Sequence, residues 1–217
     1  RMQDLAFFSF EHYPLYPCKF SWSSLYDETK LVIHIMQVWK DDGLPSNIPM
    51  FITESNLSSA ASEAYMDNFA GLWLADYIGS FLTSGGNAVY YFHYLPLRTD
   101  RGCSNSPGTF GMFRVDNDYM IVQPLAQFYA SELINKEWIE PGSKANTIFA
   151  ASSTDLDGVG DAMITSYAVH RPDGQWAVML VNRDQEVAHQ VKIAFAKDAT
   201  DPPLSFQGAV ETVAFGK

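Results

Sequence analysis

The sequence IPMFITESNLSS, residues 48–59, decides the fold of this chain. Residues 49–53 form a short and nearly continuous apolar run, which is typical of a strand buried on both faces. Glu54 follows at the carboxyl end of this run, and an amphipathic segment begins a few residues later. Open α/β sheets and (β/α)8 barrels keep their reactive groups at this end of their strands, so Glu54 is a candidate functional carboxylate. The alternative is that Glu54 only helps to start the following helix, where an acid suits the helix dipole.

Further apolar runs alternate with helical patterns on both sides of the Glu54 strand. Strands are predicted at residues 5–10 and 88–94, and helices at residues 23–40, 60–82 and 124–138. This order indicates parallel βαβ units and an α/β fold. Three such units cannot close a (β/α)8 barrel, and three strands alone leave open sheet edges. We therefore expect residues 1–140 to be part of such a barrel, either excerpted from a longer chain or completed by another polypeptide.

The pattern changes after residue 140. Apolar and polar residues now alternate, as they do in half-buried antiparallel strands. Arg171-Pro172-Asp173-Gly174 is a strong turn signal between two of these runs. Residues 141–217 are thus predicted to form an incomplete β-sandwich, with strands at residues 147–151, 164–170, 176–182 and 191–195.

The composition excludes several classes of function. Hydrophobic residues make up 47% of the 217 residues and charged residues 18%, which provides enough apolar material for a core. The formal net charge of −11 argues against binding to nucleic acid or to an anionic membrane surface. No apolar run of about 18 residues occurs, so no membrane-spanning helix is predicted.

The strand sequences resemble those of a known enzyme family. FITESN followed by a serine-containing stretch resembles the seventh strand of clan A glycoside hydrolases, and most of all the Thr-Glu-x-Asn-x-Ser pattern of family 39. FFSFEHY, residues 7–13, is similar to that family's sixth strand, and NAVYYFHYLP, residues 87–96, occupies the place of the eighth. The resemblance implies that residues 1–140 are about strands six to eight of a catalytic TIM barrel. It also implies that residues 141–217 are an accessory β-sandwich.

The activity that this resemblance implies is retaining hydrolysis of O-glycosidic bonds in oligo- or polysaccharides, without a cofactor and with Glu54 as the nucleophile. Retention needs two carboxyl groups about 5–5.5 Å apart, held in different electrostatic surroundings. The family's acid/base is the Glu of an Asn-Glu pair that ends strand four, and this chain contains no Asn-Glu dipeptide. The acid/base is therefore expected on an upstream segment, and the N-terminal half of the barrel is the expected polypeptide partner. If the chain is an excerpt of a longer one, it is expected to be inactive alone.

Polar and aromatic residues at the strand ends are candidates for contact with the carbohydrate substrate. They are Glu11, His12, Tyr13, Asn56, His93 and Tyr94. For Glu11 the alternatives are a salt bridge and a stand-in role as the acid/base, and the position of the family's acid/base on strand four rather than strand six disfavours the second. For the histidines and tyrosines it is simple packing, because strands this rich in aromatic residues can fill a barrel interior.

The two cysteines, Cys18 and Cys103, lie in loops that follow predicted strands on the same face of the expected barrel. A disulfide between them is therefore sterically plausible. Such a bond would indicate an oxidising compartment, which favours a secreted or periplasmic protein.

One loop resembles a calcium site by its acid spacing. It reads Asp155-Leu-Asp157-Gly-Val-Gly-Asp161, but Ser166 stands where an EF-hand requires Glu. A Gly/Asp-rich connection between strands explains the pattern more simply, so no metal site is predicted.

A different class of function stays open. A non-catalytic carbohydrate-binding protein, or a remnant glycosidase, would keep the aromatic cleft but lack the acid. An Asn-Glu strand end encoded upstream in the same gene would favour the enzyme.

Overall fold

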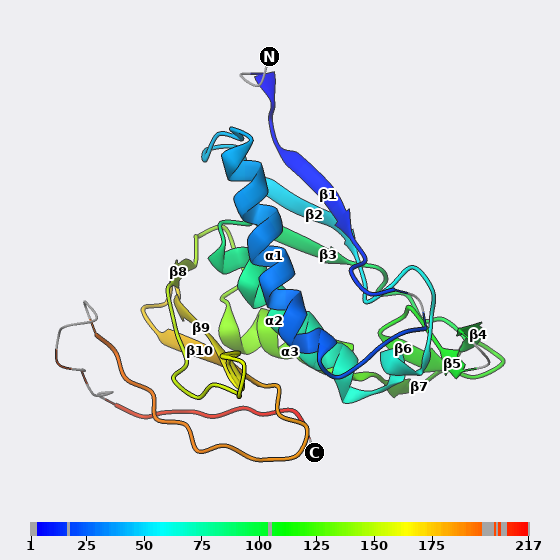
Figure 1. Cartoon of the computed structure of the whole chain (residues 1–217). Coiled ribbons are helices and arrows are strands. Elements are labelled where there is room, and N and C mark those ends of the chain that lie inside the picture. Colours follow the sequence, from blue (N-terminus) through cyan, green and yellow to red (C-terminus); the bar gives the residue numbers. More distant parts are fainter. Residues whose placement is uncertain are drawn as a thin grey trace.

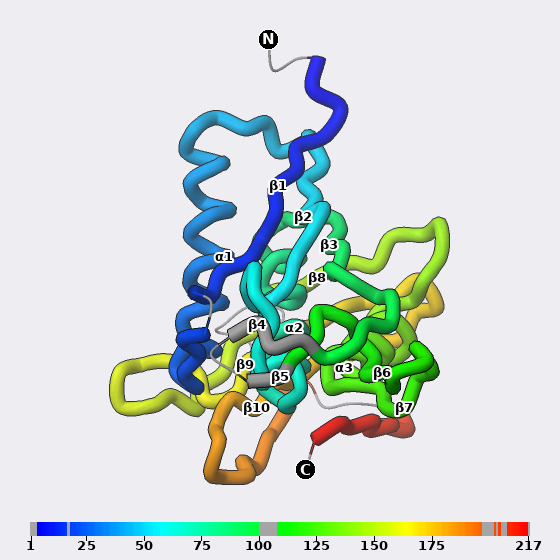
Figure 2. Tube along the Cα trace, turned by 90° about the vertical axis from the view of Figure 1, so that its right-hand side faces the viewer, coloured from blue at the N-terminus to red at the C-terminus, as the bar shows by residue number. Residues whose placement is uncertain are grey.

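The computed structural model of the protein describes residues 4–16, 18–103, 106–196, 202, 204 and 208–216, and for residues 100–103, 106 and 107 it describes the backbone only. Its first unit is a parallel sheet in the order β1-β2-β3 (Figures 1 and 2). The strands are β1 (Phe8–His12), β2 (Met50–Ser55) and β3 (Ala88–Tyr91). The parallel pairing confirms the prediction of βαβ units. The third strand ends earlier than expected because the backbone N–H of His93 donates to the carbonyl of Phe110 instead of continuing the ladder.

Helix α1 (Ser24–Asp41) connects β1 to β2 and confirms the helix predicted at residues 23–40. Its side chains Leu25, Val32 and Met36 are buried in one cluster with Met50 and Ile52 of β2. These helical positions recur at near-whole turns, so they form one apolar stripe along the helix. That stripe packs on one face of the parallel sheet.

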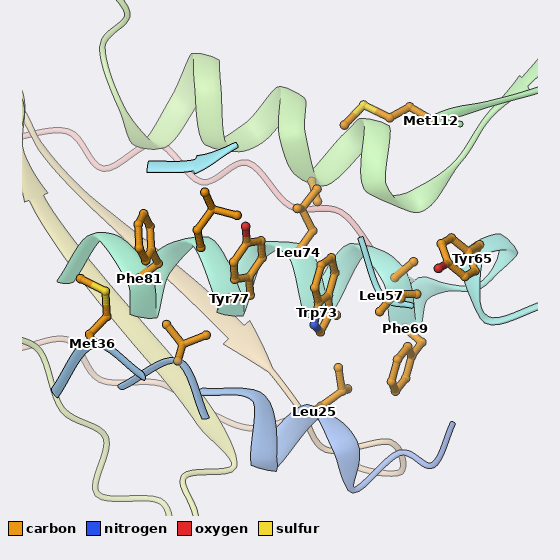
Figure 3. Close-up of a cluster of buried hydrophobic side chains, with 14 of the residues drawn as sticks. Leu25, Met36, Leu57, Tyr65, Phe69, Trp73, Leu74, Tyr77, Phe81 and Met112 are labelled. Carbon is orange, nitrogen blue, oxygen red and sulfur yellow. The ribbon is translucent and has the colours of Figure 1, made fainter. Parts of the chain in front are cut away.

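Helix α2 (Asn68–Thr83) connects β2 to β3 and is buried on two sides (Figure 3). One side contributes Phe69, Trp73, Tyr77 and Phe81 to the cluster that contains the parallel sheet, whereas Leu72, Ala75, Ile78 and Leu82 contact a second cluster. The helix starts later than predicted because the side chain of Asp67 caps it, accepting from the backbone N–H of Phe69 at 3.2 Å. The 3-10 turn η2 (Glu63–Met66) precedes this cap.

A second sheet lies on the other side of α2 (Figure 1). It is antiparallel, in the order β10-β9-β8, and is formed by β8 (Thr147–Phe149), β9 (Ile164–His170) and β10 (Trp176–Asn182). Helix α3 (Ala126–Leu133) and the π-helical turn η3 (Ile134–Trp138) lead into it, in place of the single helix predicted at residues 124–138. The predicted turn forms, with Gly174 at φ +85° and its N–H donating to the Arg171 carbonyl at 3.0 Å.

The strand predicted at residues 191–195 is wrong. Within the described residues the β pairing of this segment is limited to an isolated bridge between Phe195 and Leu204. Val191 and Ile193 are exposed, so no second layer among the described residues buries these two side chains, as the alternating pattern would require. What the structure describes of residues 141–217 is therefore one sheet packed on helices.

The segment predicted as a long loop at residues 96–118 contains two short hairpins. They are formed by β4 (Asp100–Cys103) with β5 (Ser106–Gly108), and by β6 (Phe113–Val115) with β7 (Ile121–Pro124). Asp116 closes the second hairpin, since its side chain accepts from the backbone N–H groups of Asp118 and Met120. None of the helices in the described part of the chain has the length and apolarity that crossing a membrane requires.

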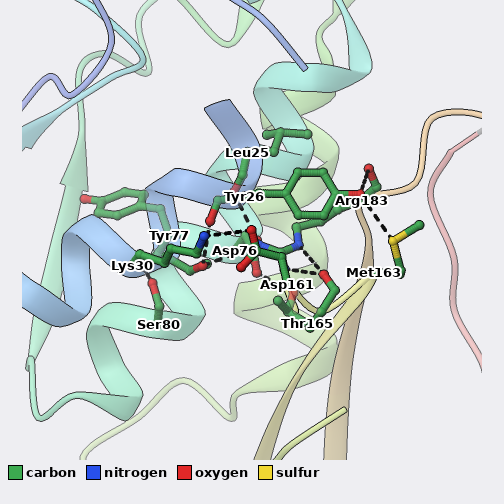
Figure 4. Close-up of polar contacts among 12 residues, drawn as sticks. Leu25, Tyr26, Lys30, Asp76, Tyr77, Ser80, Asp161, Met163, Thr165 and Arg183 are labelled. Atoms are coloured by element: carbon green, nitrogen blue, oxygen red, sulfur yellow. Dashed lines mark hydrogen bonds and ion pairs between the residues drawn. The ribbon is translucent and has the colours of Figure 1, made fainter. Parts of the chain in front are cut away.

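A buried polar network joins the antiparallel sheet to α1 and α2 (Figure 4). Arg183, directly after β10, is 3% exposed and lies 3.6 Å from the carboxylate of Asp76 on α2. Its guanidinium also donates to the carbonyls of Ala162 and Leu25 and stacks on the ring of Tyr26. Asp76 accepts from the hydroxyls of Thr165 and Tyr167. The network therefore pairs one buried cation with one buried anion.

The protonation of Asp76 should make stability depend on pH. Burial is the largest influence and raises the pKa of Asp76 from 3.8 to about 6, although Thr165, Tyr167 and Arg183 act in the opposite direction. Between these values the folded state binds the proton more tightly than the unfolded state, so stability falls as pH rises. The difference between the two pKa values corresponds to about 3 kcal/mol of folding stability, which is present below pH 3.8 and is lost by pH 7.

We expect Asp76→Asn to remove this dependence. Urea unfolding of both proteins at pH 3.5 and pH 7 measures it. The free energy of unfolding of the wild type, taken relative to that of the variant, should fall by about 3 kcal/mol from pH 3.5 to pH 7. A difference between the proteins that stays constant with pH would contradict the assignment.

Candidate active site

An irregularity in β2 determines the direction of Glu54. Phe10 of β1 pairs with Ile52, but the next residue, Glu11, pairs with Glu54, so Thr53 is an extra residue in β2. The pairing with β3 shifts at the same place. Ile52 faces the helices, and strict alternation would put Glu54 there too. The extra residue instead turns the fully buried Ser55 towards the helices and Glu54 to the opposite face of the sheet.

The side chain of Tyr13 holds Glu54. Its phenol donates a hydrogen bond to Glu54 Oε1, and both residues are partly buried. Burial, followed by the hydrogen bond and the charge of Glu54, raises the pKa of the Tyr13 phenol well above its ordinary value. The phenol thus remains a donor at neutral pH. The geometry brings together two of the predicted site residues at the carboxyl ends of β1 and β2.

Backbone contacts fix the ends of the three strands to one another. The N–H of Asn56 donates to the carbonyl of His12 at 3.2 Å, and the N–H of Phe92 donates to the carbonyl of Ser55 at 2.8 Å. The Asn56 side chain donates to the carbonyls of Phe92 and Phe110. Because Asn56 is fully buried in these bonds, its role in the structure is to brace the Glu54 loop, and we do not include it among substrate contacts.

His12 lies on the helix side of the sheet. It is 4% exposed, its Nε2 is 2.6 Å from a carboxylate oxygen of Glu28 on α1, and its ring stacks on Tyr77 of α2. We call the face of the parallel sheet opposite the helices the open face. The strand alternation that brings Glu11 to the open face turns His12 away from it. We therefore leave His12 out of the proposed sugar site.

Exposed aromatic side chains of β3 and the loop after it lie next to the strand that carries Glu54. Val89 and Tyr91 pack into the core, so the pleat directs Tyr90 to the same face as Glu54, and it is 59% exposed. Tyr94 is 61% exposed and its ring meets that of Phe113 at 5.4 Å. Tyr90 was not among the predicted site residues, although the alternation along residues 88–91 contains the signal for it.

His93 is partly buried, and its Nδ1 has no hydrogen-bond partner within the described residues. Its ring meets the Phe92 ring edge to face at 4.7 Å. This nitrogen is itself buried, so the structure does not present it to a ligand, and a sugar contact by His93 stays a prediction.

The loop after β1 contains Cys18, which takes part in a disulfide and has a positive φ of 66°. The side chain of Cys103, its predicted partner, lies outside the described residues.

One large cleft lies away from Glu54. It has a volume of about 1100 Å³ and lies between the loop after β1, the start of α2 and the loop after β10. Its lining includes Trp22, Asp67 and Asp184, whereas Glu54 lines neither it nor the smaller cleft at residues 140–144.

Within the described residues, no group of three or more His, Cys, Asp or Glu side chains is placed to bind a metal ion. In the loop that resembles a calcium site, Asp157 accepts from the backbone N–H groups of Val159 and Asp161. Lys30 binds Asp161, and His189 binds Asp155. These bonds account for the acid spacing of the loop.

No protein-family model matches the sequence, and no curated protein matches it.

The hydrogen bond from Tyr13 should matter for any reaction of Glu54. A hydrogen bond to a charged group contributes about 1.5–3 kcal/mol. For the glycosidase that the family resemblance implies, natively purified with any polypeptide that co-purifies, we therefore expect Tyr13→Phe to lower kcat/KM for dinitrophenyl glycosides by about 10–100-fold with little loss of stability. Tyr16→Phe is the matched control, because Tyr16 is 70% exposed. Equal rates for the two variants would refute the contribution of Tyr13.

Proposed function

We propose that the protein is a retaining glycoside hydrolase with Glu54 as its nucleophile. The observation that supports this most is the position of Glu54, a carboxylate at the carboxyl end of the middle parallel strand, turned to the open face and held by the Tyr13 phenol. Reactive groups of α/β folds lie at this end of the sheet. The resemblance of FITESN to family 39 supports the same assignment.

In this proposal the free oxygen of the Glu54 carboxylate attacks the anomeric carbon and forms a glycosyl ester as the bond to the leaving oxygen breaks. The Tyr13 hydrogen bond holds the other oxygen and so fixes the orientation of the carboxylate. A second carboxyl group donates a proton to the leaving oxygen and later removes one from the water that cleaves the ester. We expect that group at an Asn-Glu strand end on another segment.

The proposal also includes further strands. Helices cover one face of the parallel sheet, whereas Phe7 and Tyr90 on the other face are 49% and 59% exposed. Parallel sheets are normally covered on both faces. Closure into a (β/α)8 barrel would cover this face and would enclose Glu54 at the barrel mouth.

The stereochemistry of hydrolysis tests this function. The natively purified protein, with any polypeptide that co-purifies, is incubated with dinitrophenyl glycosides, whose leaving group needs no proton from the enzyme. Proton NMR should show the sugar first released with the anomeric configuration of the substrate. Release of the inverted sugar, or no hydrolysis across a panel of glycosides, would contradict the proposal. A non-catalytic binding protein would give the second result.

A further inference from the structure

Glu11 is the nearest strand neighbour of Glu54. The two residues pair in the register of β1 and β2, which in a sheet places their backbones about 4.8 Å apart. Glu11 stands between Phe10 and His12, which both face the helices, so its side chain leaves the sheet on the same face as Glu54. Two carboxylates therefore lie side by side on the open face.

A second observation places the charge of Glu11 near the site. Besides burial and Glu54, the charge of Glu11 also raises the pKa of the Tyr13 phenol. The charge of Glu11 is therefore felt at the phenol that holds Glu54.

Within the described residues, no cation forms an ion pair with either carboxylate. The ion pairs among the described residues include neither Glu11 nor Glu54. Glu11 is exposed, so it does not support the core. Like charges that are brought together without a counter-ion repel one another, and this effect can reject an anionic ligand.

We propose that Glu11 is a specificity residue that makes the Glu54 site select neutral glycosides and reject uronic acid glycosides. This inference rests on the proposed function. A neutral sugar offers hydroxyl groups that donate to the Glu11 carboxylate. A uronate of the same ring configuration brings a third negative charge to a site that holds two.

The test compares two inactivators that differ only at C6. One is a 2-deoxy-2-fluoro-glycosyl fluoride with a hydroxymethyl group, and the other is its uronic acid counterpart. Fluoride leaves without protonation, so labelling reports the nucleophilic step alone. The rate constants are measured by intact mass for the wild type, for Glu11→Gln and for Glu137→Gln, an exposed glutamate on η3.

The wild type should react with the neutral reagent at least about tenfold faster, and Glu11→Gln should reduce this preference roughly tenfold. Glu137→Gln should leave the preference unchanged. If Glu54 is labelled but Glu11→Gln keeps the wild-type preference, the role of Glu11 is wrong and the proposed function stands. If the neutral reagents do not label the wild type, both fail.

Discussion

Glu54→Gln is expected to abolish hydrolysis of dinitrophenyl glycosides, with kcat reduced on the order of 10⁵-fold. Removal of a nucleophile has effects of this size in other enzymes that form covalent intermediates. Gln has the shape of Glu and keeps an oxygen that accepts from Tyr13, so the fold should be unchanged. The measurement is the release of dinitrophenolate, together with the melting temperature of both proteins.

Glu63→Gln is the matched control for Glu54→Gln. Glu63 is an exposed glutamate of η2 in the same β2–α2 connection. The control should retain wild-type kcat. A Glu54→Gln variant with more than about a tenth of wild-type kcat would rule out a nucleophilic role.

The second large effect concerns stability. Arg183→Met is expected to lower the free energy of unfolding by about 3–5 kcal/mol, because it leaves the buried carboxylate of Asp76 without its cation. The carbonyls of Ala162 and Leu25 also lose their donor. Urea unfolding at pH 7 measures the loss.

Lys136→Met is the control for this variant, because Lys136 forms an exposed pair with Glu132 one helical turn away. Its cost should stay below about 1 kcal/mol. Adding Asp76→Asn to Arg183→Met should recover part of the loss, since the uncompensated charge is removed. A loss below about 1 kcal/mol for Arg183→Met would show that the network does not stabilise the packing of the antiparallel sheet on α1 and α2.

The order of strands and helices could be predicted because each element has its own local signal. The apolar run before Glu54 and the stripe of α1 are patterns within a few residues, and the structure has both elements close to where the sequence places them. The prediction of a strand at residues 191–195 was wrong because alternation alone does not show whether another layer covers the segment.

The contents of the candidate site were harder to predict, because they depend on contacts between distant residues. The extra residue at Thr53 directs Glu54 to the open face, and no Gly or Pro marks it in the sequence. His12 finds its partner Glu28 sixteen residues away on α1. Arg183 is 107 positions from Asp76, at the end of an apolar strand where a buried cation has no sequence signal.

The most direct measurement is to locate the label left by a 2-deoxy-2-fluoro-glycosyl fluoride on the natively purified protein. The trapped ester is digested at low pH, and the modified peptide is sequenced by mass spectrometry. The label should lie on Glu54 alone, and Glu54→Gln should take up none. A label on Glu11 or on any other residue, or protein that takes up no label from a panel of such reagents, would contradict the account.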